Sequence, residues 1–499
     1  MKSDEGAVSV EVASEETPFI EKMDQPKTWR DTVKHYFVVL LMATGIFTDA
    51  YDLFSINLVM VILAYQYDQP SWLTSMVADS CILGTIIGQL GFGYVGDLLG
   101  RRRASIVTSV LLIFGALSSA LLSWNIGAVS PPYFLVIWRL ILGIGIGGEY
   151  PISASVVAER SDKMANTSRG SQVAGMFSSQ GIGNLVAPIV MLLLLLIFGD
   201  LYGVVWRAAL LFGAIPAILV VYPRFKMDES KHFEKVKSES QMHPTEESNK
   251  RKVSLRFILK HYGWQLIGTA GSWFIFDIVF YGNGLFSGTL IEMMGFGGKS
   301  PGVDSFIATS EYNIIIGCIA LPGYWFGTLL IDFYGRKTLQ LCGFIAMFVL
   351  YVAIGIGYTT LEDHAPLFII LYGLTYFASN AGPNTTTYVM PTEVFPTKIR
   401  ARCHGISAAS GKLGALLGGA AMKPVLDTWG VGVTLIICGA ISLIGVFLTI
   451  FFVKESRDIS LDDLDHEFEL HLDEELDKQN AQWAQTKNIE KNDEYYDAM

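Results

Sequence analysis

The sequence predicts an all-α membrane protein with twelve membrane-spanning helices in two six-helix halves, and three observations support this fold class. The chain of 499 residues is 51% hydrophobic and only 17% charged, whereas soluble proteins carry about 25% charged residues. Long uncharged runs, such as 104–123, match the roughly 20 residues that a helix needs to cross the hydrocarbon core. A short loop motif also occurs twice, at matching places in the two halves.

Apolar runs define the expected spans, which we place at 36–63, 74–98, 104–123, 133–158, 172–198, 205–222, 263–286, 308–331, 338–358, 366–392, 403–422 and 430–453. The N-terminal half is then 36–222 and the C-terminal half 263–453, with a middle loop at 223–262. An acidic, polar tail at 1–35 is expected in place of a cleavable signal peptide. The acidic tail at 454–499 is expected to be solvated and disordered.

The distribution of Lys and Arg predicts the orientation of the chain. Basic residues gather at 101–103 and in the middle loop, whereas the loops at 64–73, 124–132, 199–204 and 359–365 contain none. Because cytoplasmic loops carry an excess of Lys and Arg, we expect both termini to be cytoplasmic. Much of the net charge of −11 lies in the C-terminal tail, so nucleic-acid binding is not supported. The five cysteines have no metal-like spacing, and we expect no metal or cofactor.

The repeated loop motif reads D-x-x-G-R-[RK], with Asp97 and Arg101 after the second span and Asp332 and Arg336 after the eighth. Two parallel halves around a site at the bilayer midplane are a transporter architecture. Glu159 and Glu393 lie near the cytoplasmic ends of their spans. The residues that we expect to have gating or structural roles are Asp97, Arg101, Arg139, Glu159, Asp332, Arg336, Glu393 and Arg400.

Ionisable residues inside the predicted spans are candidates for function, because charge is costly within a bilayer. They are Asp49, Asp52, Asp79, Arg139, Glu149, Asp277 and Lys412. Trp273, Asp277 and Tyr281 are four residues apart, so they share one face of a helix. These three residues could instead have a purely structural role, with the two aromatic side chains at the membrane interface and the Asp paired with a neighbouring helix. Glu149 is equally consistent with a proton carrier and with a buried partner of a basic residue.

The polar residues in these spans suit an anionic substrate. Lys412 is too deep to reach the interface easily, and Asn384 follows a Gly-Pro break in the tenth span. An oxyanion needs a positive charge and several donors, and protonation of Asp277 would remove its repulsion of the anion. The alternative for Lys412 is a permanent ion pair without substrate contact. The candidate substrate-binding residues are Tyr150, Gln180, Trp273, Asp277, Tyr281, Asn384 and Lys412.

The doubled loop motif, together with RLILGIGIG at 139–147, resembles the major facilitator superfamily over roughly 36–453. Within that superfamily the chain resembles the phosphate:proton symporters. The similar segments are FTDAYD at 47–52, W-x-x-x-D-x-x-x-Y at 273–281, GPNTTTYVMPTEVFPTKIR at 382–400 and CHGISAASGK at 403–412. This resemblance implies that phosphate binds at the seven candidate residues. It also implies proton passage through Asp49 and Asp52, with Asp277 as the main coupling acid, and a plasma-membrane location.

The chain departs from the phosphate symporters at two places. Glu149 stands where that family usually has Asp, and residues 282–287 read GNGLFS. Together with GEYP at 148–151, the second segment is more similar to the glycerophosphodiester permeases, a sister branch. Added glycines would suit a bulkier phosphate ester, whereas the GPNTTT block favours inorganic phosphate.

Three functions therefore stay open at this stage. The favoured one is proton-coupled symport of inorganic phosphate, with Asp49, Asp52, Glu149 and Asp277 as proton-coupling candidates. The second is uptake of a glycerophosphodiester, such as glycerophosphoinositol or glycerophosphocholine, and the third is a non-transporting phosphate sensor. An enzyme is not supported, because the sequence contains no metal cluster, nucleophile triad or phosphate loop.

Overall fold

The computed structural model describes residues 29–67, 70–127, 129–161, 168–229, 234, 253–293, 302–457 and 459–497. Most of the predicted N-terminal tail, and most of the middle loop between 230 and 252, lie outside these ranges. Every described segment of regular structure longer than a single bridge is helical.

The N-terminal half contains the six expected columns of helix. Its elements are α1 (Trp29–Gln66), α2 (Ser71–Leu99), α3 (Arg101–Leu121), α4 (Pro131–Ser161), α5 (Arg169–Phe177), α6 (Ser179–Phe198) and α7 (Tyr202–Phe225). α5 and α6 together form one candidate span of 30 residues, Arg169–Phe198.

The C-terminal half repeats this plan with more interruptions. Its elements are α10 (Leu255–Leu266), η1 (Ile267–Gly271), α11 (Ser272–Met293), α12 (Val303–Tyr334), α13 (Arg336–Ile356), α14 (Tyr358–Leu361), α15 (Ala365–Ser379), η2 (Asn380–Asn384), α16 (Thr385–Val394), α17 (Arg400–Phe452) and α18 (Leu461–Asp497). The two η segments are short π-helical stretches, and Gly430, at φ 76°, divides α17 into two straight parts.

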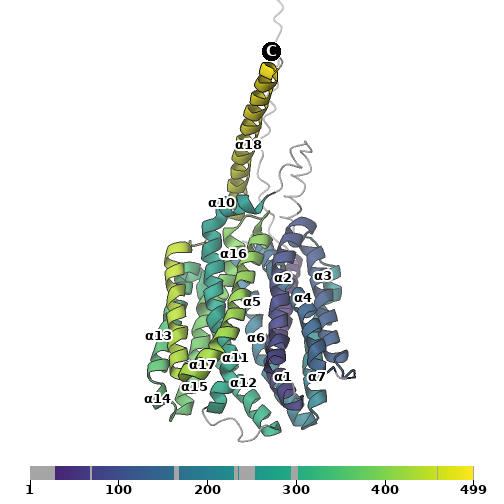
Figure 1. Cartoon of the computed structure of the whole chain (residues 1–499), viewed down its shortest axis with the longest axis vertical. Helices are drawn as coiled ribbons and strands as arrows, with labels where there is room; N and C mark the ends of the chain where they lie inside the picture. The colour runs from purple at the N-terminus through teal and green to yellow at the C-terminus, as the bar shows by residue number, and fades with distance from the viewer. Residues whose placement is uncertain are drawn as a thin grey trace, which may run out of the picture.

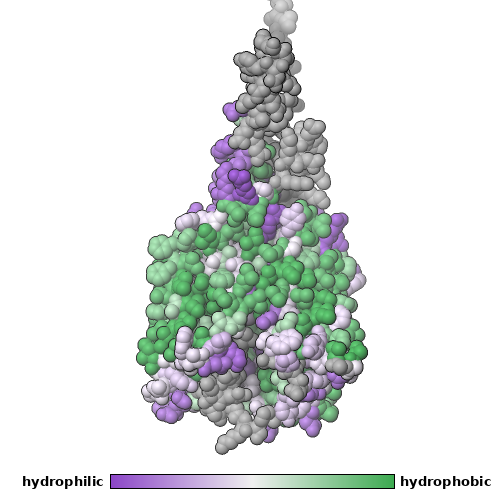
Figure 2. All heavy atoms as spheres, in the orientation of Figure 1, coloured by the Kyte–Doolittle hydropathy of each residue, from purple (hydrophilic) through white to green (hydrophobic). Residues whose placement is uncertain are grey.

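Within the described residues, nine helical stretches are long and apolar enough to cross a membrane. Figure 2 shows apolar side chains over the middle of the visible face and polar side chains toward both ends. Figure 1 shows the two halves side by side, with α18 extending beyond one end of the helical body.

Glycines allow the helices to pack closely where the site is built. A side chain at Gly143 or Gly147 of α4 would collide with the backbone of α2, at Cys81 and Thr85 respectively. Small residues at such contacts are typical of membrane helix pairs, because they let two backbones approach. The glycines of the repeated motif form its turns, since Gly100 and Gly335 have φ values of 99° and 85°, which favour glycine.

The C-terminal tail is helical over 461–497, so the prediction of a disordered tail is wrong there. Phe468 and Leu472 of α18 lie one turn apart and are buried in a cluster with Phe257 and Tyr262 of α10. The acidic composition hid this apolar stripe, which is the feature that docks a helix on its neighbour.

Candidate functional site

The central group of residues lies where α11 and α17 meet. The Nζ atom of Lys412 is 3.1 Å from Oδ2 of Asp277 and 2.7 Å from the hydroxyl of Tyr281. All three side chains are buried, with Lys412 only 2% exposed. A buried cation is stabilised only when it is paired and hydrogen-bonded, and Lys412 meets that condition through Asp277 and Tyr281.

Local sequence positions each member of this group. Trp273, Asp277 and Tyr281 lie on one face of α11, and all three side chains are buried. Gly411 has no side chain where it meets the Trp273 ring, so α17 can bring Lys412 against α11. The spacing of the predicted trio therefore produces the expected shared face.

A chain of hydrogen bonds adds Tyr150, Gln180 and Asn384 to the site. The Gln180 amide donates to the Tyr150 hydroxyl at 3.1 Å and accepts from the Tyr324 hydroxyl at 3.0 Å. The Asn384 amide donates to the Tyr324 hydroxyl at 2.9 Å. Because Tyr150 and Gln180 come from the N-terminal half and Tyr324 and Asn384 from the C-terminal half, this chain crosses between the halves.

Aromatic contacts join this polar chain to the ion pair. Nζ of Lys412 lies 5.8 Å from the Tyr150 ring centroid and 4.1 Å from that of Tyr281. The Tyr150 and Trp273 rings are 6.5 Å apart. The seven predicted substrate residues therefore form one buried cluster.

The helix break predicted at Gly382 and Pro383 positions Asn384. Gly382 has non-helical angles within η2, and the Thr385 hydroxyl bonds the freed carbonyl of Asn380 at 2.6 Å. A freed carbonyl inside a membrane must find such a local partner. The break also lets Asn384 donate to Asn380 at 2.9 Å.

Three further residues belong to the site but were not predicted from the sequence. Tyr324 bridges Gln180 and Asn384, Tyr388 stacks on Phe177 at 4.2 Å, and His404 meets the Trp273 ring edge-on at 5.7 Å. Tyr324 follows Pro322 and Gly323 in an otherwise apolar run. A polar aromatic residue in an apolar run, next to a Pro-Gly pair, was the available signal.

Glu149 forms a buried ion pair with Arg224 of α7. Its carboxylate lies 2.5 Å and 2.8 Å from the two terminal guanidinium nitrogens, and it also accepts from Thr108 and Ser153. Of the two predictions for Glu149, the geometry matches the buried partner of a basic residue. The sequence assigns Arg224 to the middle loop at 223–262. In the structure it lies in the last turn of α7, and its side chain is 2% exposed.

Asp49 and Asp52 are fully buried on α1. None of their four carboxylate oxygens has a hydrogen-bond partner in the described part of the chain. Arg139 donates instead to the backbone carbonyl of Asp52, at 2.8 Å. Asp79 is half-buried on α2 and is not among the described contacts of the central cluster.

Two buried ion-pair clusters tie the halves together between the central cluster and α18. In the first, Arg101 lies 2.9 Å from Glu159 and 3.0 Å from Asp97. Arg400, the first residue of α17, lies 3.2 Å from the same Glu159 oxygen. Asp97 also accepts from the backbone N–H of Arg402, at 2.9 Å.

The second cluster has the same plan with the halves exchanged. Arg336 lies 2.7 Å from Glu393 and 3.2 Å from Asp332. Arg169 from the N-terminal half approaches Glu393 at 3.8 Å, and the Ser168 hydroxyl donates to Asp332 at 2.6 Å. The predicted gating residues other than Arg139 therefore form two ion-pair clusters at this end of the molecule, and each cluster joins the two halves.

α18 holds the first cluster directly. Its Asp465 accepts from the backbone N–H of Thr397 at 2.6 Å and from the Thr397 hydroxyl at 2.8 Å. The Thr397 carbonyl in turn accepts from Arg101 at 3.1 Å. The neighbouring Lys398 pairs with Glu469 of α18 at 2.5 Å.

A histidine pair lies in the contact between α18 and α10. The rings of His261 and His471 are 4.7 Å apart, and Glu475 of α18 lies 2.6 Å from Lys260 and 3.9 Å from His261. Burial lowers the pKa of His261, and the nearby His471 and Lys260 lower it further. Glu475 and Glu474 of α18 act in the opposite direction, but the net effect is a lowered pKa, which favours a neutral His261 in this contact.

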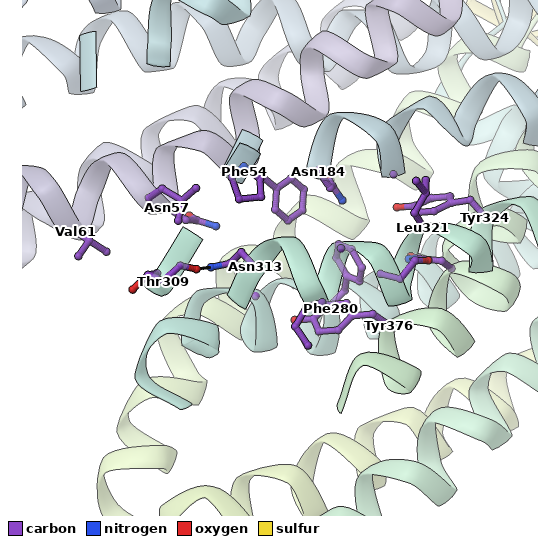
Figure 3. Close-up of a pocket in the computed structure, with 18 residues that line it drawn as sticks. Phe54, Asn57, Val61, Asn184, Phe280, Thr309, Asn313, Leu321, Tyr324 and Tyr376 are labelled. Atoms are coloured by element: carbon purple, nitrogen blue, oxygen red, sulfur yellow. Dashed lines mark hydrogen bonds between the residues drawn. The ribbon is translucent and has the colours of Figure 1, made fainter. Parts of the chain in front are cut away.

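A cavity of about 150 Å³ opens on the opposite side of the central cluster. Side chains of α1, α6, α11, α12 and α15 line it, so both halves contribute. Figure 3 shows Val61 and Thr309 toward one end of this cavity and Tyr324 toward the other. Because Tyr324 also bonds Gln180 and Asn384, the cavity adjoins the central cluster.

Comparison with known proteins places these observations in context. A family model described as "Sugar (and other) transporter" matches residues 38–258 and 234–468. "Probable inorganic phosphate transporter 1-6" of Arabidopsis thaliana is 34% identical over 87% of this chain and 94% of its own length. "Low affinity inorganic phosphate transporter 1" of Petunia hybrida is 32% identical over 87% of this chain and 93% of its own length.

Solved structures also match the helical body. The proton:xylose symporter XylE of the major facilitator superfamily, bound to 6-bromo-6-deoxy-D-glucose, superposes with a TM-score of 0.71. The match covers 87% of this chain and 99% of that chain at 20% identity, so it shows a shared fold.

Proposed function

This chain belongs to the sugar (and other) transporter family, and we propose that it carries inorganic phosphate into the cell together with protons. It is a multi-pass membrane transporter of the major facilitator fold and not an enzyme. Relatives named inorganic phosphate transporters, each matched over most of its length, support phosphate as the substrate. We place the protein in the plasma membrane, surrounded by its lipid bilayer.

The proposal includes twelve spans with both termini in the cytoplasm. Nine candidates satisfy length and apolarity, and the break at Gly430 splits one of them into two. The interrupted columns of α10 to α11 and of α15 to α16 supply two more, which makes twelve. The Lys and Arg of the repeated motif lie at the α18 end, which supports a cytoplasmic position for that end.

The observation that carries the proposal is the buried Lys412 among donors from both halves. Its ammonium group, the Tyr and Trp hydrogen-bond donors and the amides of Gln180 and Asn384 match the needs of a phosphate oxyanion. Hydrogen bonds between charged groups and phosphate are roughly twice as strong as neutral ones. A phosphate at this place would replace Asp277 as the partner of Lys412.

Proton coupling follows from that replacement. While Asp277 is ionised, it occupies Lys412 and repels the anion; once protonated, it releases Lys412 and gains a donor hydrogen. Asp49 and Asp52, buried without partners among the described residues, are proposed to relay protons. Glu149 takes a structural role in this scheme, because Arg224 holds its charge.

The membrane potential limits the proton count. Moving one elementary charge is worth about 2.3 kcal/mol per 100 mV. Dihydrogen phosphate with one proton is neutral and gains nothing from the voltage. Accumulation by an inside-negative potential therefore requires at least two protons for each monoanion.

Transport of labelled phosphate into vesicles that contain the purified protein tests the proposal. We expect uptake to follow an inward proton gradient and to stop when that gradient is collapsed. Phosphate binding without uptake would instead identify a non-transporting sensor. Uptake of glycerophosphoinositol or glycerophosphocholine in preference to phosphate would identify a glycerophosphodiester carrier.

A further inference from the structure

The cavity beside the central cluster has an unusual combination of side chains. Asn57, Asn184 and Asn313 supply amides, and Thr309 supplies a hydroxyl. Aromatic rings, among them Phe280, and aliphatic side chains, among them Leu58 and Ile316, form the remaining walls. Amides both donate and accept hydrogen bonds, so this lining suits hydroxyl groups attached to a small carbon skeleton.

No formal charge lines this cavity. Its eighteen lining residues, all within the described ranges, include no Lys, Arg, His, Asp or Glu. A channel that only guided a phosphate anion would benefit from positive charge, because clefts of one sign concentrate ions of the other. A neutral lining instead fits the uncharged part of a larger substrate.

One amide oxygen in the cavity wall points to a missing ligand. Oδ1 of Asn184 is buried and has no hydrogen-bond partner in the described part of the chain. A buried polar atom without a partner costs free energy comparable to a lost hydrogen bond. A hydroxyl group in the cavity would satisfy this oxygen.

The cavity and the central cluster share residues at their junction. Tyr324 and Asn380 line the cavity, and both accept hydrogen bonds from the Asn384 amide. A phosphate group near Lys412 and Asn384 could therefore extend a substituent past Tyr324 into the cavity. Gly284 lines the cavity, and a Cβ atom there would have open space around it within the described part of the chain.

We propose that the cavity is a subsite for the hydroxylated part of a phosphate monoester of a small polyol. The monoester would place its phosphate in the central cluster and its polyol beside Asn184. This inference rests on the proposed phosphate function and widens the substrate class of the same site. It commits to a monoester, because this one cavity adjoins the central cluster through Tyr324 and Asn380 and can hold one neutral substituent.

Inhibition of labelled phosphate uptake tests the subsite, with glycerol 3-phosphate as the probe and glycerol as its uncharged control. We expect glycerol 3-phosphate to compete and glycerol to have no effect. Phosphate uptake without competition by the ester would overturn the inference and leave the proposed function intact. Absence of phosphate uptake would count against the proposed function itself.

Two variants separate the subsite from the anion site. Gly284→Leu should fill the cavity and raise the inhibition constant of glycerol 3-phosphate at least tenfold, while the KM of phosphate changes less than twofold. Asn184→Leu should weaken the ester about fivefold, as loss of one hydrogen bond implies. Gly91→Leu, on an exposed face of α2 with equally open space, is the matched control.

Two results would contradict the assignment of the cavity. Equal loss of phosphate and ester in Gly284→Leu would make the cavity only the entrance for phosphate. Competition by glycerophosphocholine equal to that by glycerol 3-phosphate would show that a second substituent is accommodated, and the monoester assignment would fail.

Discussion

Replacement of Asp277 by Asn is the sharpest perturbation of the central ion pair. The substitution keeps the size of the side chain and removes the charge that lies 3.1 Å from Lys412. In the proposed mechanism, the amide of the Asp277→Asn variant imitates the protonated acid permanently. Phosphate would then reach Lys412 without competition from a carboxylate.

The size of the effect follows from the bond that phosphate no longer has to displace. A hydrogen bond to a charged group contributes about 1.5–3 kcal/mol, which corresponds to about 10- to 150-fold in affinity. We therefore expect Asp277→Asn to bind phosphate more tightly than the wild type at neutral pH. Its binding should also lose most of its pH dependence.

Two measurements on purified protein check this prediction. Phosphate binding at several pH values should give a flat profile for Asp277→Asn, and uptake into vesicles with an imposed proton gradient should fall at least tenfold. Asp427→Asn is the matched control, because Asp427 pairs with Lys423 on an exposed face. Normal accumulation with wild-type pH dependence in Asp277→Asn would remove Asp277 from the coupling role.

Three other expectations concern the ion pairs around the site and the docking of α18. Glu149→Gln should destabilise the fold by about 3–5 kcal/mol, because Arg224 stays buried without a countercharge. Thermal unfolding measures this loss of stability. Unchanged stability together with an altered pH profile of uptake would instead identify Glu149 as a proton carrier. Arg400→Ala should loosen the first ion-pair cluster and speed alkylation of Cys403, which is fully buried nearby; an unchanged alkylation rate would show that this cluster does not close the cytoplasmic side. The pKa of His261 is lowered when α18 is docked, so the undocked state binds a proton more readily. As the pH falls below the ordinary histidine pKa, protonation should therefore favour the undocked state and weaken docking. Docking should be stronger above that pH. Fluorescence transfer between labels on α18 and the helical body should report that loss, and His261→Phe should abolish its pH dependence; an equal pH response in the variant would refute the role of His261.

The sequence predicted the parts of this protein that depend on local spacing. Long apolar runs gave the helices, and the four-residue spacing of Trp273, Asp277 and Tyr281 gave their shared face. The break before Asn384 was also predictable, because Gly382 and Pro383 weaken the helix next to each other in one polar stretch. These features need no information about the neighbouring helices.

Features that depend on contacts between helices were not predictable in the same way. Arg224 follows a predicted span, so its position in the sequence suggests a loop residue. In the structure it lies in the last turn of α7 and pairs with Glu149. Tyr324 is a single polar aromatic residue in an apolar helix, and only its contacts with Gln180 and Asn384 assign it to the site. The apolar stripe of α18 was hidden by the acidic residues around it.

The pairing of Lys412 with Asp277 bears on the step in which the unloaded carrier turns back toward the outside. A symporter must make that return without cargo, and an unpaired buried cation would oppose the movement. The charges of Lys412 and Asp277 offset each other, and the amides and hydroxyls of the cluster bond one another. We therefore expect the carrier to return with Asp277 ionised and paired with Lys412, so that the buried cation needs no second anion as its partner in that step.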